Sequence, residues 1–313
     1  MEFGTWNLEF KNIVMKNLII LSFALLISQG IVQSQSFNSC LPEGITFYSQ
    51  IEIDNFQVNY PGCTEVAGDV IIRGDDIINL NGLSIVTSIG GNLTIGGGSA
   101  WSGSGNPLLT SLTGLANLTS IGDSIYIGYN SLNNLTGLEG LINIPGDLMI
   151  EYNSLTSLNG LENLNTIAGA LFLIDNSSLT SLNGLESIES IGGLVVSNNS
   201  SLVNLPGLEN LNTIAGGLYL IGNDSLTSLN GMDSLTFIGE NLDILFNSSL
   251  SDCDVQGICM YLSDPTGVIE IHDNAIGCNS PEEVEEACDT LGIESPVSGQ
   301  QSAVGSYPNP TNG

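Results

Sequence analysis

The chain repeats itself along most of its length with a period of 23 or 24 residues. Residues 155–178 and 202–225 are identical at 17 of 24 positions, and the decapeptide GLENLNTIAG occurs unchanged in both. A Leu-x-Gly-Leu motif, with Met as its final residue in the last copy, has its glycines at positions 82, 114, 137, 160, 184, 207 and 231. A fixed period in this range is typical of a solenoid, in which each turn buries its apolar face by stacking on its neighbours.

The apolar pattern within one repeat favours strands over helices. No stretch keeps apolar residues at i, i+3, i+4 and i+7 over the ten or more residues that a helix needs. The segments GALFLIDN and GGLYLIGN instead alternate, which places Leu171 and Leu173, and then Leu218 and Leu220, on the inward side. We therefore predict an all-β fold, a right-handed parallel β-solenoid of leucine-rich repeats about 23–24 residues long.

An asparagine closes the expected strand in six successive turns. These residues are Asn130, Asn153, Asn176, Asn199, Asn223 and Asn247. An asparagine at a solenoid corner can bond backbone groups of its own turn and of the next turn, so we expect a structural ladder. The alternative, exposed glycan acceptors in NSS and NLT sequences, conflicts with a buried corner role.

These residues carry a resemblance to known families. The segment LNTIAGGLYLIGN, residues 211–223, resembles the receptor L-domain family, the leucine-rich solenoids of insulin-type and growth-factor receptors and of fungal wall proteins. It also resembles ordinary leucine-rich repeats, but the extra residue between the Ile and the strand in TIAGGLYL fits the L-domain pattern better. The resemblance covers roughly residues 40–290 and implies a recognition scaffold rather than a particular ligand.

The ends of the chain differ from the repeats. Residues 1–34 are expected to be an upstream extension and a secretory signal peptide, with the apolar run of residues 18–27 too short to span a membrane. No later stretch has the eighteen apolar residues of a transmembrane segment. We expect an N-terminal cap and first rungs over 35–79, L-domain-like repeats over 80–252 and a C-terminal cap over 253–288.

A linker is expected over residues 289–306. The string YPNPTNG, residues 307–313, resembles the opening of the C-terminal sorting domain of bacterial type IX secretion. The resemblance implies export through the outer membrane. Because the chain stops at this motif, we expect it to be truncated there.

Six cysteines flank the repeats and none lies within them. An even number in an exported chain indicates disulfides, and CxxC metal spacing is absent. We expect Cys40 to pair with Cys63 around the strand-rich stretch ITFYSQIEIDNFQVNY. Four cysteines at the C-terminal end allow three pairings, of which the repeat register favours Cys253–Cys278 and Cys259–Cys288. There, DVQGICMYL suggests a short helix, and SPEEVEEAC a helix with Ser280 as N-cap and Glu283 completing a capping box.

The charge is strongly acidic, with 33 Asp and Glu against 3 Lys and Arg, of which only Arg73 follows the leader. Such a chain repels nucleic acid and anionic lipid, and high charge favours solubility outside the cell. Weak, distributed calcium binding is the alternative, with candidate ligands near Asp75 and at Asp252 to Asp254. Neither has the spacing of a calcium loop, so we expect no dedicated metal site and no cofactor.

Catalysis has little support in the sequence. The one histidine after the leader, His272, lies in the last expected strand, and no nucleophile-elbow sequence accompanies it. Lyase chemistry on uronic acids needs cationic groups that the chain lacks. Hydrolysis by two carboxylates is chemically open, but no carboxylate pair stands in a distinctive motif. We predict a protein that is not an enzyme.

The outward side of the expected strands is the better candidate site. One column holds Thr94, Tyr126, Met149, Phe172, Val195, Tyr219 and Asp243, and a neighbouring column holds Gly96, Gly128, Glu151, Ile174, Ser197, Ile221 and Leu245. Exposed apolar side chains on consecutive rungs usually mark an interaction surface, although β-propensity alone could explain them. We expect the ligand-binding face to include Tyr126, Met149, Phe172, Ile174, Tyr219 and Ile221.

The predicted function is therefore a secreted or cell-surface recognition and adhesion module that binds a protein or carbohydrate ligand. A structural surface spacer and a solenoid carbohydrate-active enzyme are the alternatives. An ice-binding protein is a further one, because LTSL segments align Thr110, Thr156, Thr180 and Thr227. That column is interrupted by Asn133 and Val203, which favours a solvated turn face.

Overall fold

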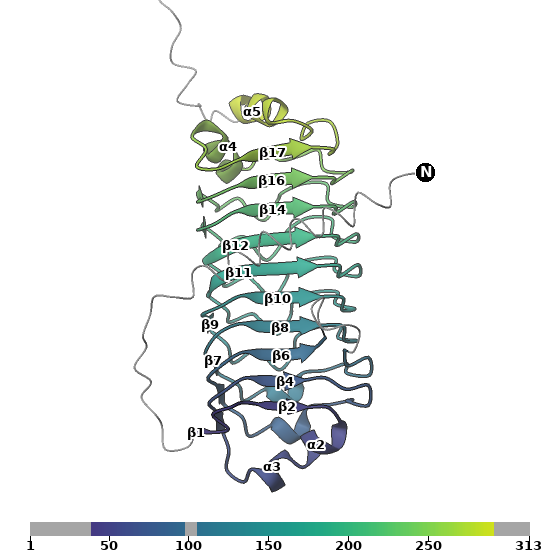
Figure 1. The fold of residues 1–313 in the computed structure, drawn as a ribbon. Helices are drawn as coiled ribbons and strands as arrows, with labels where there is room; N and C mark the ends of the chain where they lie inside the picture. The colour runs from purple at the N-terminus through teal and green to yellow at the C-terminus, as the bar shows by residue number, and fades with distance from the viewer. Residues whose placement is uncertain (1–38, 98–104, 291–313) are drawn as a thin grey trace, which may run out of the picture. The chain divides into compact units, whose positions relative to one another are not determined.

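Ten short parallel strands stack into one long sheet, as the repeat period predicts (Figure 1). The computed structural model describes residues 39–97 and 105–290, all within a compact unit of residues 38–313. The expected leader and sorting motif lie outside the described residues, as does the expected linker from residue 291 onward. Its first two residues, 289 and 290, instead belong to the last helix of the C-terminal cap. The stacked strands are β2 Ile45–Phe47, β4 Val70–Ile72, β6 Leu93–Gly96, β8 Ile125–Gly128, β10 Leu148–Glu151, β11 Thr166–Ile174, β12 Ser190–Ser197, β14 Leu218–Ile221, β16 Leu242–Leu245 and β17 Ile269–His272.

A second row of shorter strands lies one corner earlier in each turn. Four of them form a separate sheet in the order β1-β3-β5-β7. Of the others, β9 pairs with the first residues of β11 and β13 with the first residues of β12, which run through the corner, and β15 pairs with β13. Their bounds are β1 Ser39–Cys40, β3 Glu65–Val66, β5 Ser88–Ile89, β7 Ser120–Ile121, β9 Asn143–Ile144, β13 Thr213–Ile214 and β15 Phe237–Ile238. All pairings between described strands are parallel, so each turn of the chain forms one rung of a β-solenoid.

The core is a column of leucine and isoleucine side chains supplied by every rung. In the rung of β11, for example, Leu158, Leu161, Leu164, Ile167 and Leu171 are all buried. Truncating one such side chain to Ala costs about 2–5 kcal/mol, because neighbouring rungs cannot collapse into the space. Most of the positions that recur from repeat to repeat are thus core positions.

The glycine of the Leu-x-Gly-Leu motif is required by a close approach between rungs. From Gly137 onward this glycine has a positive φ, for instance 112° at Gly160. A Cβ on Gly160 would lie 2.2 Å from the backbone carbonyl of Leu135, one rung earlier. Both the dihedral angle and the contact exclude a side chain.

A ladder of buried asparagines holds the corner after each strand. In its regular part, the side-chain Oδ1 of one asparagine accepts a hydrogen bond from the backbone N–H of the asparagine one rung earlier, as Asn199 does from Asn176 at 3.1 Å. The Nδ2 of Asn199 donates to Leu173 O at 2.9 Å and to Ser197 O at 3.1 Å. The six asparagines expected from the sequence are all buried in this column.

The ladder extends one rung further at each end, to Asn106 and Asn274. Asn106 was not predicted as a ladder member because residues 97–105 separate it from the end of β6, whereas Asn130 follows the end of β8 by two residues. One step of the ladder is missing between Asn130 and Asn153. Among the described residues, Asn153 Oδ1 is the one buried side-chain polar atom that has no hydrogen-bond partner.

The N-terminal cap differs from the expectation of a strand-rich stretch. After β2 the chain forms two short helices, α2 Gln50–Asp54 and α3 Phe56–Asn59. Ile53 and Phe56, three residues apart, both turn toward the core and close the end of the solenoid. The disulfide Cys40–Cys63 links β1 to the segment before β3. Two later turns contain 3₁₀ helices, η1 Asn81–Leu83 and η2 Thr113–Leu115.

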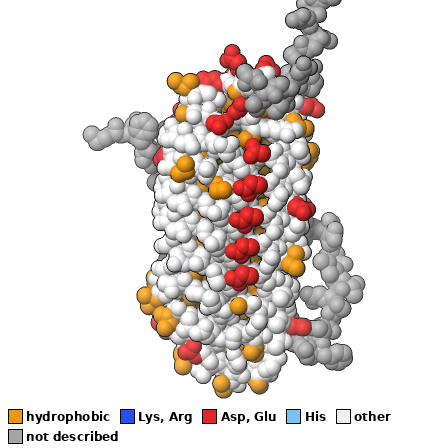
Figure 2. Space-filling model, turned by 180° about the vertical axis from the view of Figure 1, so that it is seen from behind, with side chains coloured by type: hydrophobic (Ala, Val, Ile, Leu, Met, Phe, Trp, Pro, Cys, Tyr) orange, Lys and Arg blue, Asp and Glu red, His pale blue; other side chains and the backbone are white. Residues whose placement is uncertain are grey.

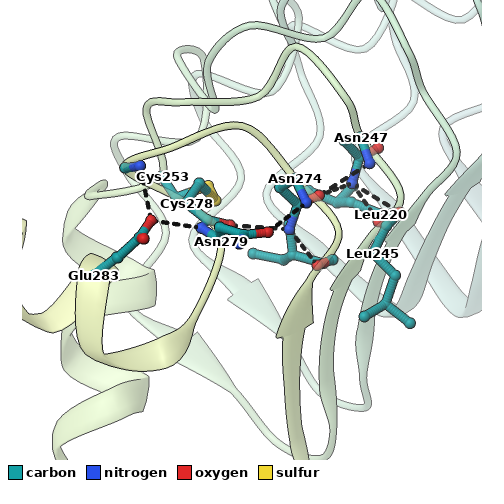
Figure 3. The surroundings of a disulfide bond; sticks show 10 residues. Leu220, Leu245, Asn247, Cys253, Asn274, Cys278, Asn279 and Glu283 are labelled. Carbon is teal, nitrogen blue, oxygen red and sulfur yellow. Dashed lines mark hydrogen bonds between the residues drawn. A yellow bond between two sulfur atoms is a disulfide. The ribbon is translucent and has the colours of Figure 1, made fainter.

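The C-terminal cap consists of α4 Gln256–Ser263, β17 and α5 Pro281–Thr290. The disulfides Cys253–Cys278 and Cys259–Cys288 are the two pairs that the repeat register favours. The first joins two successive rungs beside the end of the asparagine ladder (Figure 3), and the second ties α4 to α5. Among the described helices, none has the length and apolar character to cross a membrane.

The helix cap of α5 differs in detail from a capping box. The Glu283 N–H donates to Ser280 Oγ at 3.3 Å, as expected for an N-cap. The Glu283 carboxylate, however, accepts from the N–H groups of Gly277 and Asn279 in the preceding loop, at 2.8 and 3.0 Å (Figure 3). Glu283 therefore fixes the loop that carries Cys278.

Candidate functional site

The outward face of the ten-strand sheet, called the strand face below, presents the candidate side chains in register. Tyr126 pairs with Met149 and with Thr94, Met149 with Phe172, and Val195 with Tyr219 across neighbouring parallel strands. The first predicted column thus follows one line across the rungs. Because side chains alternate along each strand, these side chains point away from the core.

The side chains of this column are less exposed than the sequence analysis expected. Tyr126, Met149 and Tyr219 are half-buried, and the expectation of an exposed Phe172 is wrong, because only 8% of its surface is exposed. Met149 and Val195 flank it on the adjacent rungs. In a parallel sheet the rungs lie about 4.8 Å apart, so neighbouring large side chains cover one another.

Two tyrosines of the strand face lie flat against glycine backbone. The Cε2, Cζ and hydroxyl of Tyr219 all come within 2.8 Å of the position that a Cβ would take on Gly217. The hydroxyl end of Tyr126 lies over Gly128 in the same manner. A ring that lies along the sheet in this way can offer one face to a ligand.

The second column is mostly covered, in contrast to the expectation of an exposed one. Gly96, Gly128 and Leu245 are buried, whereas Ile174, Ser197 and Ile221 are half-buried. Glu151 in this column is only 3% exposed. Its carboxylate accepts a hydrogen bond of 2.5 Å from the Tyr126 hydroxyl, which also bonds Gly97 O.

The corner next to the strand face carries a feature that the sequence analysis missed. The residue before every ladder asparagine except Asn106 adopts a positive φ, although in most rungs it is not glycine. These residues are Tyr129, Tyr152, Asp175, Asn198, Gly222, Phe246 and Asp273. The frequent Asp, Asn and Gly at this position are a sequence signal of left-handed backbone, but Tyr and Phe are unusual there.

Tyr129 and Tyr152 occupy this corner on successive rungs and stack on each other, with ring centroids 4.6 Å apart. Burial raises the pKa of Tyr152, and its hydrogen bond to the Asp175 carboxylate raises it further. Burial also raises the pKa of Tyr126, followed by the hydrogen bond to Glu151. The phenols of Tyr126 and Tyr152 therefore keep their protons, and each donates a hydrogen bond to a carboxylate. We call Tyr126, Tyr129, Glu151, Tyr152 and Asp175 the tyrosine–carboxylate cluster.

The C-terminal end of the strand face is acidic. Asp243 pairs in register with Glu270, and Leu245 with His272. Burial and then the negative charge of Glu270 raise the pKa of Asp243 to about 6, while His272 acts in the opposite direction. His272 is exposed and lies 2.8 Å from Asp273, with its ring edge-on to Phe246.

A row of carboxylates follows the solenoid on the side opposite the strand face (Figure 2). It comprises Glu139, Glu162, Glu186, Glu209 and Asp233, each two residues after the motif glycine. Each carboxylate accepts a hydrogen bond from the N–H of that glycine, at 2.8–2.9 Å for the glutamates and 3.4 Å for the aspartate. The sequence analysis missed this row, although the recurring Gly-Leu-Glu was visible in the repeats.

The aligned threonines have a structural use. The hydroxyls of Thr156, Thr180 and Thr227 donate to backbone carbonyl oxygens of the preceding rung, at 3.0–3.4 Å. Thr227, for example, donates to Val203 O. These hydrogen bonds explain the recurrence of threonine, so an ice-binding role is not needed to account for it.

Within the described residues, no three His, Cys, Asp or Glu side chains are grouped so as to hold a metal ion. Asp252, one of the candidate calcium ligands, instead shares a hydrogen bond with Asp254, which raises its pKa. A small cavity of about 10 Å³ lies in the core near Phe47, Phe56 and Leu83, and its lining is apolar. It has about the volume of one water molecule, so it does not offer a ligand site.

Comparison with known proteins supports the fold and little more. The family model of the BspA type leucine rich repeat region matches residues 119–253 in six copies. No curated protein and no solved structure matches the chain. The chain is thus a leucine-rich-repeat-like solenoid, and β4, β6 and β17 continue the same stacking outside the matched residues. Such repeats suggest a protein-interaction module and are typically not enzymes.

Proposed function

We propose that this protein is an exported, non-catalytic recognition module that binds a protein or carbohydrate ligand on its strand face. The observation that carries the proposal is a group of half-buried aromatic and aliphatic side chains that β8, β10, β11 and β14 hold on the strand face. Its members are Tyr126, Met149, Ile174, Tyr219 and Ile221. Apolar groups that a rigid scaffold holds at the surface are typical of binding surfaces.

Export is supported by two kinds of observation. Three disulfides close the two ends of the solenoid, which is typical of proteins in oxidising compartments. The leader of residues 1–34 and the YPNP string at 307–310 add the expected signals for secretion and surface sorting. The resemblance to receptor L-domains supports ligand recognition as the role of the exported module.

The test is a binding array of extracellular proteins and glycans, probed with the purified protein and two double variants. The first variant, Tyr219→Ser with Ile221→Ser, removes apolar groups from the strand face. The matched control, Phe237→Ser with Ile142→Ser, removes an exposed aromatic residue of β15 and an exposed isoleucine that directly precedes β9, away from the strand face.

We expect binding to be lost in the first variant and kept in the control. Circular dichroism checks that both variants keep the β fold. Equal binding by both variants would show that recognition lies elsewhere, and a protein that binds nothing on the array would favour the spacer function.

A further inference from the structure

The tyrosine–carboxylate cluster differs from the rest of the corner column. It lies across β8, β10 and β11, where strands are adjacent (Figure 1). It is the place within the described corner column where aromatic rings occupy two successive rungs and stack. Carboxylates of Glu151 and Asp175 lie on the same rungs or the next, and both receive phenol hydrogen bonds.

The ladder beside the cluster lacks one hydrogen bond that its regular part makes. Tyr129 and Tyr152 hold positive φ angles of 58° and 51°, which residues with a Cβ adopt with strain, as Phe246 does at 57° in the same column. The missing ladder step, at Asn153 Oδ1, falls between the same two rungs. The strain is common to the corner column, so the two features particular to this pair are the ring stacking and the lost buried hydrogen bond, which together point to a function rather than a gain in stability.

The chemistry of the cluster selects a cationic ligand. Carboxylates favour positive charge, and tyrosine faces attract guanidinium and ammonium groups. The whole chain has a formal net charge of −30, which raises the local concentration of basic partners and repels acidic ones. A guanidinium suits the site best, because its plane stacks on rings while its edge bonds a carboxylate.

The solenoid already contains one contact of this kind. Arg73, which directly follows β4, lies with its Cζ 5.1 Å from the centroid of the Tyr48 ring. Its Nη2 donates to the Tyr48 hydroxyl at 3.3 Å. A guanidinium can therefore lie on a tyrosine ring of this scaffold.

We propose that the tyrosine–carboxylate cluster binds an arginine side chain of a basic protein segment. The proposal rests on the proposed function and specifies its partner as a basic protein rather than a glycan. Tyr152, 39% exposed, supplies the accessible ring. Asp175, which is half-buried, is the carboxylate that the guanidinium can reach, and the buried Glu151 adds negative charge without direct contact. The flat ring of Tyr126 continues the surface toward the strand face.

The test uses a fluorescein-labelled peptide of alternating glycine and arginine with the purified protein, measured by fluorescence polarisation at low and moderate salt. A peptide with citrulline in place of arginine has the same shape without the charge. Tyr152→Ala is the variant. Phe246→Ala is the matched control, because Phe246 has the same backbone conformation in the same column and is 46% exposed.

We expect Tyr152→Ala to weaken binding of the arginine peptide about tenfold and Phe246→Ala to change it less than about twofold. Tyr152→Phe keeps the ring and should retain most of the affinity, which separates a binding defect from a folding defect. The citrulline peptide should not bind.

Equal affinities for Tyr152→Ala and Phe246→Ala, or binding of the citrulline peptide, would overturn the proposal. If neither peptide binds while the array still shows binding that depends on Tyr219 and Ile221, the arginine site is wrong and the proposed recognition function stands.

Discussion

Asp243 shows how neighbouring rungs change the chemistry of a single side chain. In register with Glu270 and half-buried on the strand face, it has a pKa of about 6, compared with 3.8 for an unperturbed aspartate. The folded protein therefore binds a proton at this group between those two pH values, where the unfolded chain does not. Stability from this group is present at low pH and is lost as the pH rises through about 6.

Replacing Asp243 with Asn should remove this pH dependence. We expect wild-type protein to gain stability between pH 7 and pH 5 relative to Asp243→Asn, and the variant to be the more stable of the two at pH 7. Thermal unfolding at both pH values measures the difference, with Asp264→Asn, an exposed acid after α4, as the control. Identical pH slopes for wild type and Asp243→Asn would contradict the assignment.

The burial and backbone conformation of some residues depend on neighbouring rungs and could not be predicted from the sequence. The alternation of apolar residues predicts that Phe172 points away from the core. Its side chain is nevertheless buried, because Met149 and Val195 flank it on the adjacent stacked rungs. Tyr129 and Tyr152 were missed because nothing in their residue type favours left-handed backbone. Their roles follow from the ladder asparagines beside them, which fix the corner.

At the scale of elements, the asparagine ladder makes each corner depend on the rung before it. Asn199 bonds Asn176 N, Leu173 O and Ser197 O, whereas the Oδ1 of Asn153 has no partner. Two residues in equivalent positions therefore support the fold to different degrees.

Asn199→Ala should destabilise the protein more than Asn153→Ala. Both variants leave two backbone carbonyls without the amide donor, but only Asn199→Ala also leaves a buried N–H unpaired. We expect the difference to be about 1–3 kcal/mol. Urea unfolding followed by circular dichroism measures it, and a larger effect of Asn153→Ala would contradict the assignment of the missing step.

Strands, ladder and caps were predictable to different extents. The 23- or 24-residue period identifies the parallel solenoid, and the spacing of asparagines identifies the corner. The helices α2 and α3 were not predicted, since Ile51 and Ile53 alternate with polar residues as in a strand. The helices form because the end of the core is open there, and Ile53 and Phe56 cover it together.

For the whole molecule, the opposite sides of the solenoid have different chemistry. The strand face carries aromatic and aliphatic side chains, and the opposite side carries the row of five carboxylates (Figure 2). Neighbouring carboxylates of the row belong to successive rungs, which lie about 4.8 Å apart along the solenoid, so their charges repel one another. The glycine N–H bonds hold them in line.

Salt should therefore stabilise the protein. Raising NaCl shortens the Debye length from about 30 Å at 0.01 M to about 3 Å at 1 M, so the melting temperature should rise. A variant with Glu162, Glu186 and Glu209 changed to Gln should show a smaller rise. Three Gln substitutions at Glu282, Glu285 and Glu286 in α5 serve as the control for net charge. An unchanged salt response in the row variant would show that the row does not strain the fold.

The near-identity of the rungs has a consequence for how the chain reaches its native register. The decapeptide at residues 160–169 returns at 207–216, two rungs later, with the same core and corner residues. During folding, either copy can template the next strand, so a mis-stacked intermediate with two turns looped out competes with the native order. The three disulfides each join residues of one cap, so they fix where the stack begins and ends but do not count the rungs between. The native register inside the stack therefore depends on the few positions at which the rungs differ.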